Sequence, residues 1–120
     1  MNATRPKEIV YLHYFSTQVV EGIVHSFFAM DDFSEFVFSL GHAQQITEDT
    51  ILKSIKKLMK DKNFKSSPKK PFTLVISIGE EIESKIRALI QPYKGKLVFD
   101  KKTVTNKTQH FINSFRQHKQ

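Results

Sequence analysis

The chain of 120 residues corresponds to one domain, long enough to close a single core without disulfide bonds. It contains no cysteine, which excludes disulfides, thiolate metal sites and a cysteine nucleophile. No apolar run approaches about 18 residues, and the start MNATRPKEIVYLHYF lacks the pattern of a signal peptide, so we expect a soluble, cytoplasmic protein without a membrane contact.

The formal net charge of +7 is unevenly distributed along the chain. Residues 1–52 contain two basic and seven acidic residues, whereas residues 53–120 contain seventeen basic and five acidic ones. A basic half of this kind predicts a polyanionic partner such as nucleic acid, or an acidic protein surface. The alternative is a solvated, lysine-rich exterior without a specific partner.

The first elements are predicted as an arm, a strand and a helix. Residues 1–7 are polar and are expected to form a loose arm. Ile9 to Phe15 is aromatic and β-branched throughout, which predicts a strand. Ser16 or Thr17 then caps a predicted helix to about Met30, with a wide apolar arc formed by Val19, Val20, Ile23, Val24, Phe27 and Phe28.

The first predicted strand carries aromatic side chains on both faces. Tyr11, His13 and Phe15 alternate on one face and Tyr14 lies on the other, a pattern that sheet-type RNA readers use for base stacking. Packing in the core is the favoured interpretation. A single histidine among apolar neighbours is more often a packed, hydrogen-bonded core residue than a ligand or a base.

An acidic pair and an aromatic run follow the predicted first helix. Asp31 and Asp32 are interpreted as a turn or helix cap, because no histidine or glutamate stands at ligand spacing beside them. Phe33 to Leu40 fits both a strand and a helical stripe; we favour a strand closed by Gly41, with 42–46 as a loop.

The next segment combines a clear amphipathic helix with a linker. Thr47 is the predicted N-cap, and one face of the helix is apolar while the opposite face carries four lysines: Lys53, Lys56, Lys57 and Lys60. Residues 61–71 read DKNFKSSPKKP, a Ser-Pro-rich linker and the expected boundary between two halves of the chain.

The stretch from Phe72 to Val104 predicts a strand, a helix and a parallel strand. Phe72 to Ile78 is a continuous apolar run, typical of a strand buried on both faces. Gly79 allows a turn into a helix with glutamates in its first turn, and Lys96 to Asp100 forms the second strand. Lys101 and Lys102 are expected at the end of that strand, before a last helix capped by Thr105 or Asn106.

These elements predict a compact, single-domain α/β fold of about four strands and four helices in β-α-β-α-β-α-β-α order. Sliding the second half back by about 60 residues aligns apolar positions of the two halves. We therefore also consider that the domain consists of two degenerate β-α-β-α halves. The alternative is that two stretches of this kind align by apolar pattern alone.

The sequence contains no recognisable catalytic or cofactor motif. The turn after Ile78 has one glycine and two carboxylates, which would repel phosphate, and no metal-ligand spacing or nucleophile elbow is present. We predict neither a cofactor nor a metal site, and a protein that is not an enzyme. His13, His25, His42 and His110 could form a site only if the fold brought them together.

The favoured function is a small basic nucleic-acid-binding or regulatory module that contacts the phosphate backbone through lysines. The predicted contact residues are Lys53, Lys56, Lys57, Lys60, Lys69, Lys70, Lys101 and Lys102. The alternative is a non-catalytic assembly component, a homodimer or an adaptor. Its predicted interface lies on the first helix at Val20, Val24 and Phe28, where the apolar arc is wider than one sheet face would cover.

Overall fold

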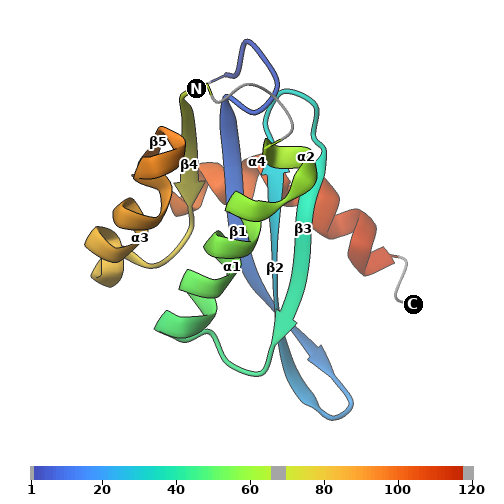
Figure 1. The fold of residues 1–120 in the computed structure, drawn as a ribbon. Helices are drawn as coiled ribbons and strands as arrows, with labels where there is room; N and C mark the ends of the chain where they lie inside the picture. Colours follow the sequence, from blue (N-terminus) through green and yellow to red (C-terminus); the bar gives the residue numbers. More distant parts are fainter. Residues whose placement is uncertain (1, 66–69, 118–120) are drawn as a thin grey trace.

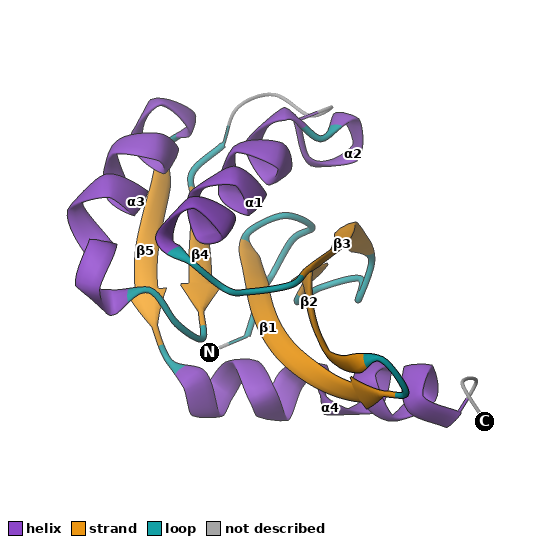
Figure 2. Ribbon diagram, turned by 90° about the horizontal axis from the view of Figure 1, so that it is seen from below, coloured by secondary structure: helices purple, strands orange, loops and turns teal. Residues whose placement is uncertain are grey.

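The computed structural model describes residues 2–65 and 70–117 and contains one five-stranded sheet with helices on both faces (Figures 1 and 2). The strand order across the sheet is β3-β2-β1-β4-β5. The strands are β1 (Ile9–Val19), β2 (Gly22–Asp31), β3 (Val37–Ala43), β4 (Phe72–Ile76) and β5 (Gly95–Phe99). The helices are α1 (Glu48–Lys60), α2 (Lys62–Lys65), α3 (Glu83–Ile90) and α4 (Lys101–Gln117), with 3₁₀ turns η1 (Glu80–Ile82) and η2 (Gln91–Tyr93).

The sheet is mixed. Strands β1, β2 and β3 form an antiparallel meander, while β4 pairs with β1 and β5 pairs with β4, both in parallel. The predicted parallel pair joined by a helix is therefore confirmed. Because β1 pairs directly with β4, both halves of the chain contribute to one sheet.

The predicted helix from Ser16 or Thr17 to Met30 is wrong. This segment forms the end of β1, a two-residue turn and β2, with Val19 paired to Gly22 across the hairpin. The error has a physical cause: the second half of β2 is buried on both faces, so Phe27 and Phe28 pack on opposite sides of the sheet. A strand buried on both faces has consecutive apolar residues, and such a run also fits a wide apolar arc of a helix. The β-branched residues around Gly22 favour strands.

The element order differs from the prediction for this reason. In the described part of the chain, five strands and four helices follow one another as β-β-β-α-α-β-α-β-α, so the first half is not a β-α-β-α copy of the second. The strand expected within Phe33 to Leu40 is present but extends from Val37 to Ala43. Gly41 does not end it: Gly41 lies opposite Phe27, where an added Cβ would come within 2.4 Å of that ring.

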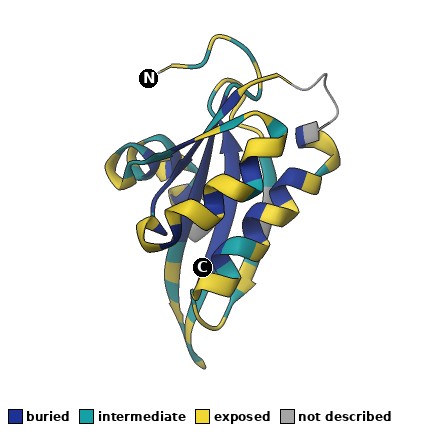
Figure 3. Ribbon diagram, turned by 60° about the vertical axis from the view of Figure 1, so that its left-hand side comes forward, coloured by how far each residue is buried: buried dark blue, intermediate teal, exposed yellow. Residues whose placement is uncertain are grey.

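Two apolar layers enclose the sheet, and Figure 3 shows buried strands beneath helices that are exposed on their outward sides. Helices α1 and α3 cover one face, where the packed side chains include Leu12, Phe27, Ile55, Leu74 and Ile86. Helix α4 crosses the other face, where its Val104 and Ile112 pack on residues that include Tyr11, Phe28 and Val75. The odd and even positions of β1 therefore belong to different layers.

The helix starts follow local capping chemistry. Thr47 is the N-cap of α1, as predicted, and its hydroxyl accepts from the Thr50 backbone N–H at 3.2 Å. Helix α4 begins earlier than expected, because Asp100 accepts from the backbone N–H of Thr103 at 3.0 Å. Lys101 and Lys102 consequently lie in the first turn of α4 and not at the end of a strand.

The predicted arm and linker both contact the rest of the domain. The Ala3 N–H donates to Asp32 at 2.8 Å and the Lys7 N–H donates to Asp31 at 2.8 Å, which ties the arm to the loop after β2. The linker begins with the short helix α2, and residues 66–69 lie outside the described residues. Among the described helices, none has both the length and the apolar character needed to cross a bilayer.

Candidate nucleic-acid interface

Helix α1 presents the lysine face to solvent. Ile51, Ile55, Leu58 and Met59 are buried against the sheet, and the four lysines at positions 53, 56, 57 and 60 are exposed on the opposite side. Lys53 forms an ion pair with Asp49 at 3.0 Å, in which both side chains are 74% exposed, so solvent screens it strongly. Lys56, Lys57 and Lys60 have no carboxylate partner among residues 2–65 and 70–117.

The lysine face continues into α2 at the end of α1. Phe64 of α2 packs edge-on against Phe38 of β3, with ring centroids 5.5 Å apart, and against Phe72 of β4 at 5.0 Å. These contacts hold α2 beside the start of β4. The exposed Lys62 therefore lies at the same end of the sheet as Lys70, which precedes β4.

Several further cations gather at this end because parallel strands begin on the same side of a sheet. The Arg5 guanidinium donates to the carbonyl of Pro71, just before β4, and the Phe72 N–H donates to the carbonyl of Lys94, just before β5, at 3.2 Å. We call this group the basic edge: Arg5, Lys7, Lys62, Lys70, Lys94 and Lys96.

The opposite end of the parallel strands is acidic. Helices that follow parallel strands start at the carboxyl ends of those strands, and η1 and α3 bring three glutamates there. Lys85 of α3 contacts Glu48 in the first turn of α1, which places the start of α1 at the same end. We call this group the acidic edge: Glu48, Asp49, Glu80, Glu81 and Glu83.

The structure brings only part of the predicted lysine set together. The four lysines of α1 share one surface, and Lys70 lies at the amino end of β4. Lys101 and Lys102 lie on α4, across the sheet from α1, and follow the carboxyl end of β5 (Figure 2). Lys69 lies outside the described residues. One flat contact cannot include both α1 and the start of α4.

Sequence reasoning missed most of the basic edge. Arg5, Lys7, Lys94 and Lys96 are scattered in the sequence and form no run or helical stripe. The available signal was their position, since each stands just before or at the start of a predicted strand. Once strands are known to be parallel, residues at their starts must be neighbours.

The aromatic face of β1 is closed by α4. Tyr11 and His13 are buried, and Phe28 beside them meets Phe111 of α4 with ring centroids 4.6 Å apart. The packed position predicted for Tyr11 and His13 is confirmed, whereas the hydrogen bond expected for His13 is not, and neither ring is open for base stacking. Burial, together with the positive charge of Lys101, lowers the pKa of His13 to about 4, and its Nδ1 has no hydrogen-bond partner within the described part of the chain.

The predicted interface residues do not share a helical arc, because no helix exists there. Val20 lies in the turn of the β1–β2 hairpin and is fully exposed, Val24 is half-buried on β2, and Phe28 is 1% exposed in the core. Phe28 therefore cannot contact a second chain in this fold. The exposed apolar surface of the hairpin is formed by Val20 and Ile23.

The histidines are separated by the fold. His25 pairs with Ser16 and His42 with Ser26, both at 2.8 Å, while His110 contacts Glu35 at 3.1 Å. Within residues 2–65 and 70–117, no group of three or more histidine, aspartate and glutamate side chains is arranged to hold a metal ion.

Comparisons with known proteins identify the fold. No family model and no curated protein matches the chain. A chain of the simian T-cell lymphotropic virus intasome, solved with PP2A regulatory subunit B56 gamma, aligns over 95% of this chain with a TM-score of 0.68 and 12% identity. The aligned region spans 41% of the intasome chain. The HTLV-2 integrase catalytic core domain, solved in dimeric form with magnesium, aligns over 92% of this chain and 70% of its own length, with a TM-score of 0.61 and 17% identity. At these identities the likeness concerns the fold.

Proposed function

We propose that the chain is a non-catalytic nucleic-acid-binding module that contacts the phosphate backbone through α1 and the basic edge. The observation that carries the proposal is the row of exposed lysines on α1, which continues through Lys62 to the amino ends of β4 and β5. Three of the α1 lysines lack a carboxylate among the described residues, so their charge is available to a polyanion.

The chemistry of this surface favours contacts to phosphate over contacts to bases. Lysine ammonium groups act as mobile point charges, and neutralising phosphates releases condensed counterions whatever the base sequence. Sequence reading in a duplex would require side chains fixed against base edges in a groove. The proposed binding by α1 is therefore independent of sequence and strongly dependent on salt.

The fold comparison is consistent with the proposal. One structural neighbour belongs to an intasome and the other is an integrase catalytic core. The exposed lysines of α1 support nucleic-acid binding independently of the fold comparison.

The experiment is a salt titration of binding to a labelled oligonucleotide. The slope of log K against log salt is expected to reach about −0.9 per phosphate contacted in duplex DNA. Replacing Lys53, Lys56, Lys57 and Lys60 together by glutamine should make the slope less negative by about 3 to 4, with an unchanged circular dichroism spectrum. An unchanged slope in this variant, or no binding at low salt, would disprove the proposal.

A second candidate function is self-assembly, favoured by the opposite charges at the two edges. The basic edge of one copy and the acidic edge of another are complementary, and Val20 and Ile23 add exposed apolar surface at the hairpin tip. The HTLV-2 neighbour was solved in dimeric form. Sedimentation across a hundredfold concentration range tests this function: assembly predicts a rise in mass that Val20→Asp or high salt reverses, and a constant monomer excludes it.

A further inference from the structure

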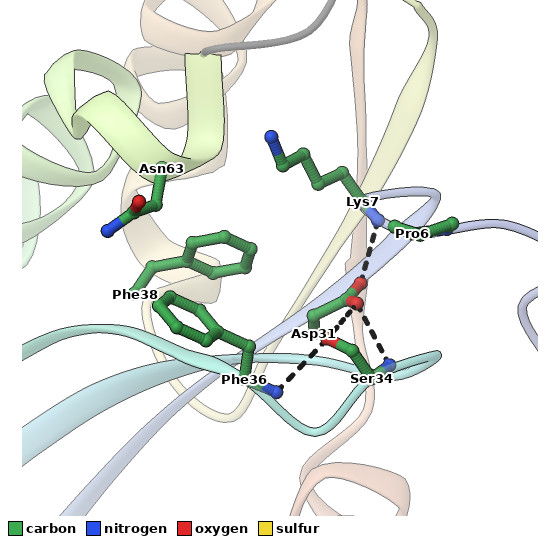
Figure 4. A pocket seen from close by; sticks show the side chains of 7 residues that line it. All are labelled: Pro6, Lys7, Asp31, Ser34, Phe36, Phe38 and Asn63. Atoms are coloured by element: carbon green, nitrogen blue, oxygen red, sulfur yellow. Dashed lines mark hydrogen bonds between the residues drawn. The ribbon is translucent and has the colours of Figure 1, made fainter.

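A pocket of about 340 Å³ lies beside the basic edge, between the arm, the β2–β3 loop and α2 (Figure 4). Its lining residues are Pro6, Lys7, Asp31, Ser34, Phe36, Phe38 and Asn63. Pro6 and Lys7 stand on one side and Asn63 on the other, with the two phenylalanine rings between them. The volume is near the lower limit for small-molecule sites, which suits one ring system.

Asp31 holds the walls of the pocket in place. Its side chain is buried and accepts from the Lys7 N–H at 2.8 Å, from the Ser34 N–H at 3.0 Å and from the Ser34 hydroxyl at 2.6 Å. The Asp31 N–H also donates to the carbonyl of Phe36 at 2.9 Å. The backbones of Lys7 and Glu35 both adopt the left-handed region, at φ 64° and 62°. Non-glycine residues adopt it where the surroundings compel them.

The aromatic rings of the pocket are packed against the core on one side and exposed to solvent on the other. Phe36 is 47% exposed and stands edge-on to Phe38, with centroids 5.3 Å apart. Phe38 is fixed in turn by Phe64 of α2, which packs on the buried Phe72. A flat ligand on Phe36 would therefore rest on a row of four rings anchored in the core. Exposing an aromatic ring to water is unfavourable in free energy, so a ligand that covers Phe36 would be stabilised by burying it.

The charges around the pocket distinguish between possible aromatic ligands. Lys7 lines the rim, and Lys62 directly precedes Asn63 in α2. The one carboxylate in the lining, Asp31, is surrounded by three donors. The carboxylates next to the lining residues also have partners: Asp61 accepts from the Asn63 N–H, Glu35 contacts His110 and Asp32 contacts Lys107. The surroundings thus favour an aromatic ring attached to a negatively charged backbone. Asn63 brings a carboxamide, which can both donate to and accept from a heterocycle.

We propose that the pocket receives one unstacked base of a single-stranded nucleic acid, stacked on Phe36, while Lys7, Lys62 and the α1 lysines contact the flanking phosphates. Phenylalanine faces stack on any base, so the contact selects single strands over duplex without selecting a sequence. This inference rests on the proposed function and adds the form of nucleic acid that is bound.

The experiment compares strands that differ only in their bases. A fluorescein-labelled twelve-nucleotide oligothymidylate, a fully abasic strand of the same length and a duplex are titrated with the protein by anisotropy. The parent should bind the oligothymidylate about tenfold more tightly than the abasic strand, because one stacked base accounts for a factor of this order. Phe36→Ala should remove that difference and leave the affinity for the abasic strand and the duplex unchanged.

Phe33→Ala is the matched control. Phe33 lies in the same loop and is 53% exposed, yet it does not line the pocket. The Phe33→Ala variant should keep the preference of the parent for oligothymidylate over the abasic strand. An equal loss in the two variants would overturn the proposal, since a general effect on the loop would then explain the loss.

A spectroscopic test does not depend on affinity. The chain contains no tryptophan, so Phe36→Trp places the single indole in the pocket and Phe33→Trp places it outside. Oligothymidylate should quench the emission at position 36, the abasic strand should not, and neither should quench position 33. Equal emission changes at the two positions would contradict base stacking in the pocket.

The two proposals fail in different ways. If the parent binds all three nucleic acids in a salt-dependent manner but Phe36→Ala has no effect, the pocket proposal is wrong and the proposed function stands. If the parent binds none of them at low salt, both are wrong. Saturable quenching at position 36 by a peptide with an aromatic residue, without quenching by oligothymidylate, would assign the pocket to a protein ligand.

Discussion

The two ends of the parallel strands, the acidic edge and the basic edge, differ in how their charged side chains are paired. At the acidic edge, the carboxylates stand in the first turns of α1, η1 and α3, and three of them form ion pairs: Glu48 with Lys85, Asp49 with Lys53 at 3.0 Å, and Glu83 with Arg87 at 3.3 Å. At the basic edge and along α1, cations outnumber carboxylates, and a pocket with an exposed ring lies beside them.

The difference indicates which charges belong to folding and which are available for binding. Carboxylates in the first turn of a helix stabilise it by interacting with the unpaired N–H groups there. Lysines on the outer face of α1 contact nothing in the apolar core, and only those in the last turn gain from the helix dipole. We therefore expect changes at one edge to alter stability slightly and changes at the other to alter binding strongly.

The largest expected effect comes from reversing the charge of α1. Replacing Lys53, Lys56, Lys57 and Lys60 by glutamate should reduce nucleic-acid binding below detection at 150 mM salt, because four favourable phosphate contacts become repulsive. The charge-matched control replaces Lys85, Arg87, Lys101 and Lys102 by glutamate, all of which are exposed and distant from the basic edge.

The control should retain binding within about fivefold, the residual loss reflecting net charge alone. Anisotropy with one oligonucleotide measures both variants. Equal loss in the two would show that total charge, and not the surface of α1, determines binding.

The next largest effect concerns pH and His13, which packs between Phe15 and Phe28 near Lys101. Its pKa falls from the ordinary 6.5 to about 4 in the folded state, so folding favours the neutral imidazole. This stabilisation is complete above pH 6.5 and is lost as pH falls toward 4, by about 3 kcal/mol in total. Urea unfolding between pH 7 and 4 should show the decline in the parent. His13→Phe should show a smaller decline over the same range.

A smaller effect is expected from the carboxylate that supports the pocket. Asp31→Ala leaves the Lys7 N–H, the Ser34 N–H and the Ser34 hydroxyl without their acceptor, which should lower the free energy of unfolding by about 2 kcal/mol. Asp31→Asn should retain part of that stability, since its carbonyl still accepts. Denaturant unfolding measures both. An Asp31→Ala protein as stable as the parent would show that the loop is not held by this side chain.

The smallest effect is expected from the N-cap of α1, next to the acidic edge. Thr47→Ala removes the acceptor for the Thr50 N–H and should destabilise α1 by about 1 kcal/mol, without changing nucleic-acid affinity. Thermal unfolding and anisotropy together check this separation. A loss of nucleic-acid affinity as large as that of the lysine variants would mean that binding depends on the stability of α1 and not on its lysine charges.

The sequence was most informative where local chemistry and burial agree. Helix α1, the strands β4 and β5 and the helix between them were all predictable, because capping residues, a helical stripe and continuous apolar runs stand in the expected order. The exposed position of the α1 lysines follows from the same stripe. Asp31 was likewise recognisable as a residue that organises a turn.

Only the tertiary structure decided the first half of the chain and the extent of the candidate site. The second half of β2 is buried on both faces, so its sequence lacks the alternation that distinguishes a strand from a helix, and Val20 proved to be the tip of a hairpin. The basic edge and the pocket combine residues from the arm, α2 and the starts of distant strands. Their proximity results from strand pairing between positions 64 residues apart, such as Tyr11 of β1 and Val75 of β4. No local pattern encodes such a pairing.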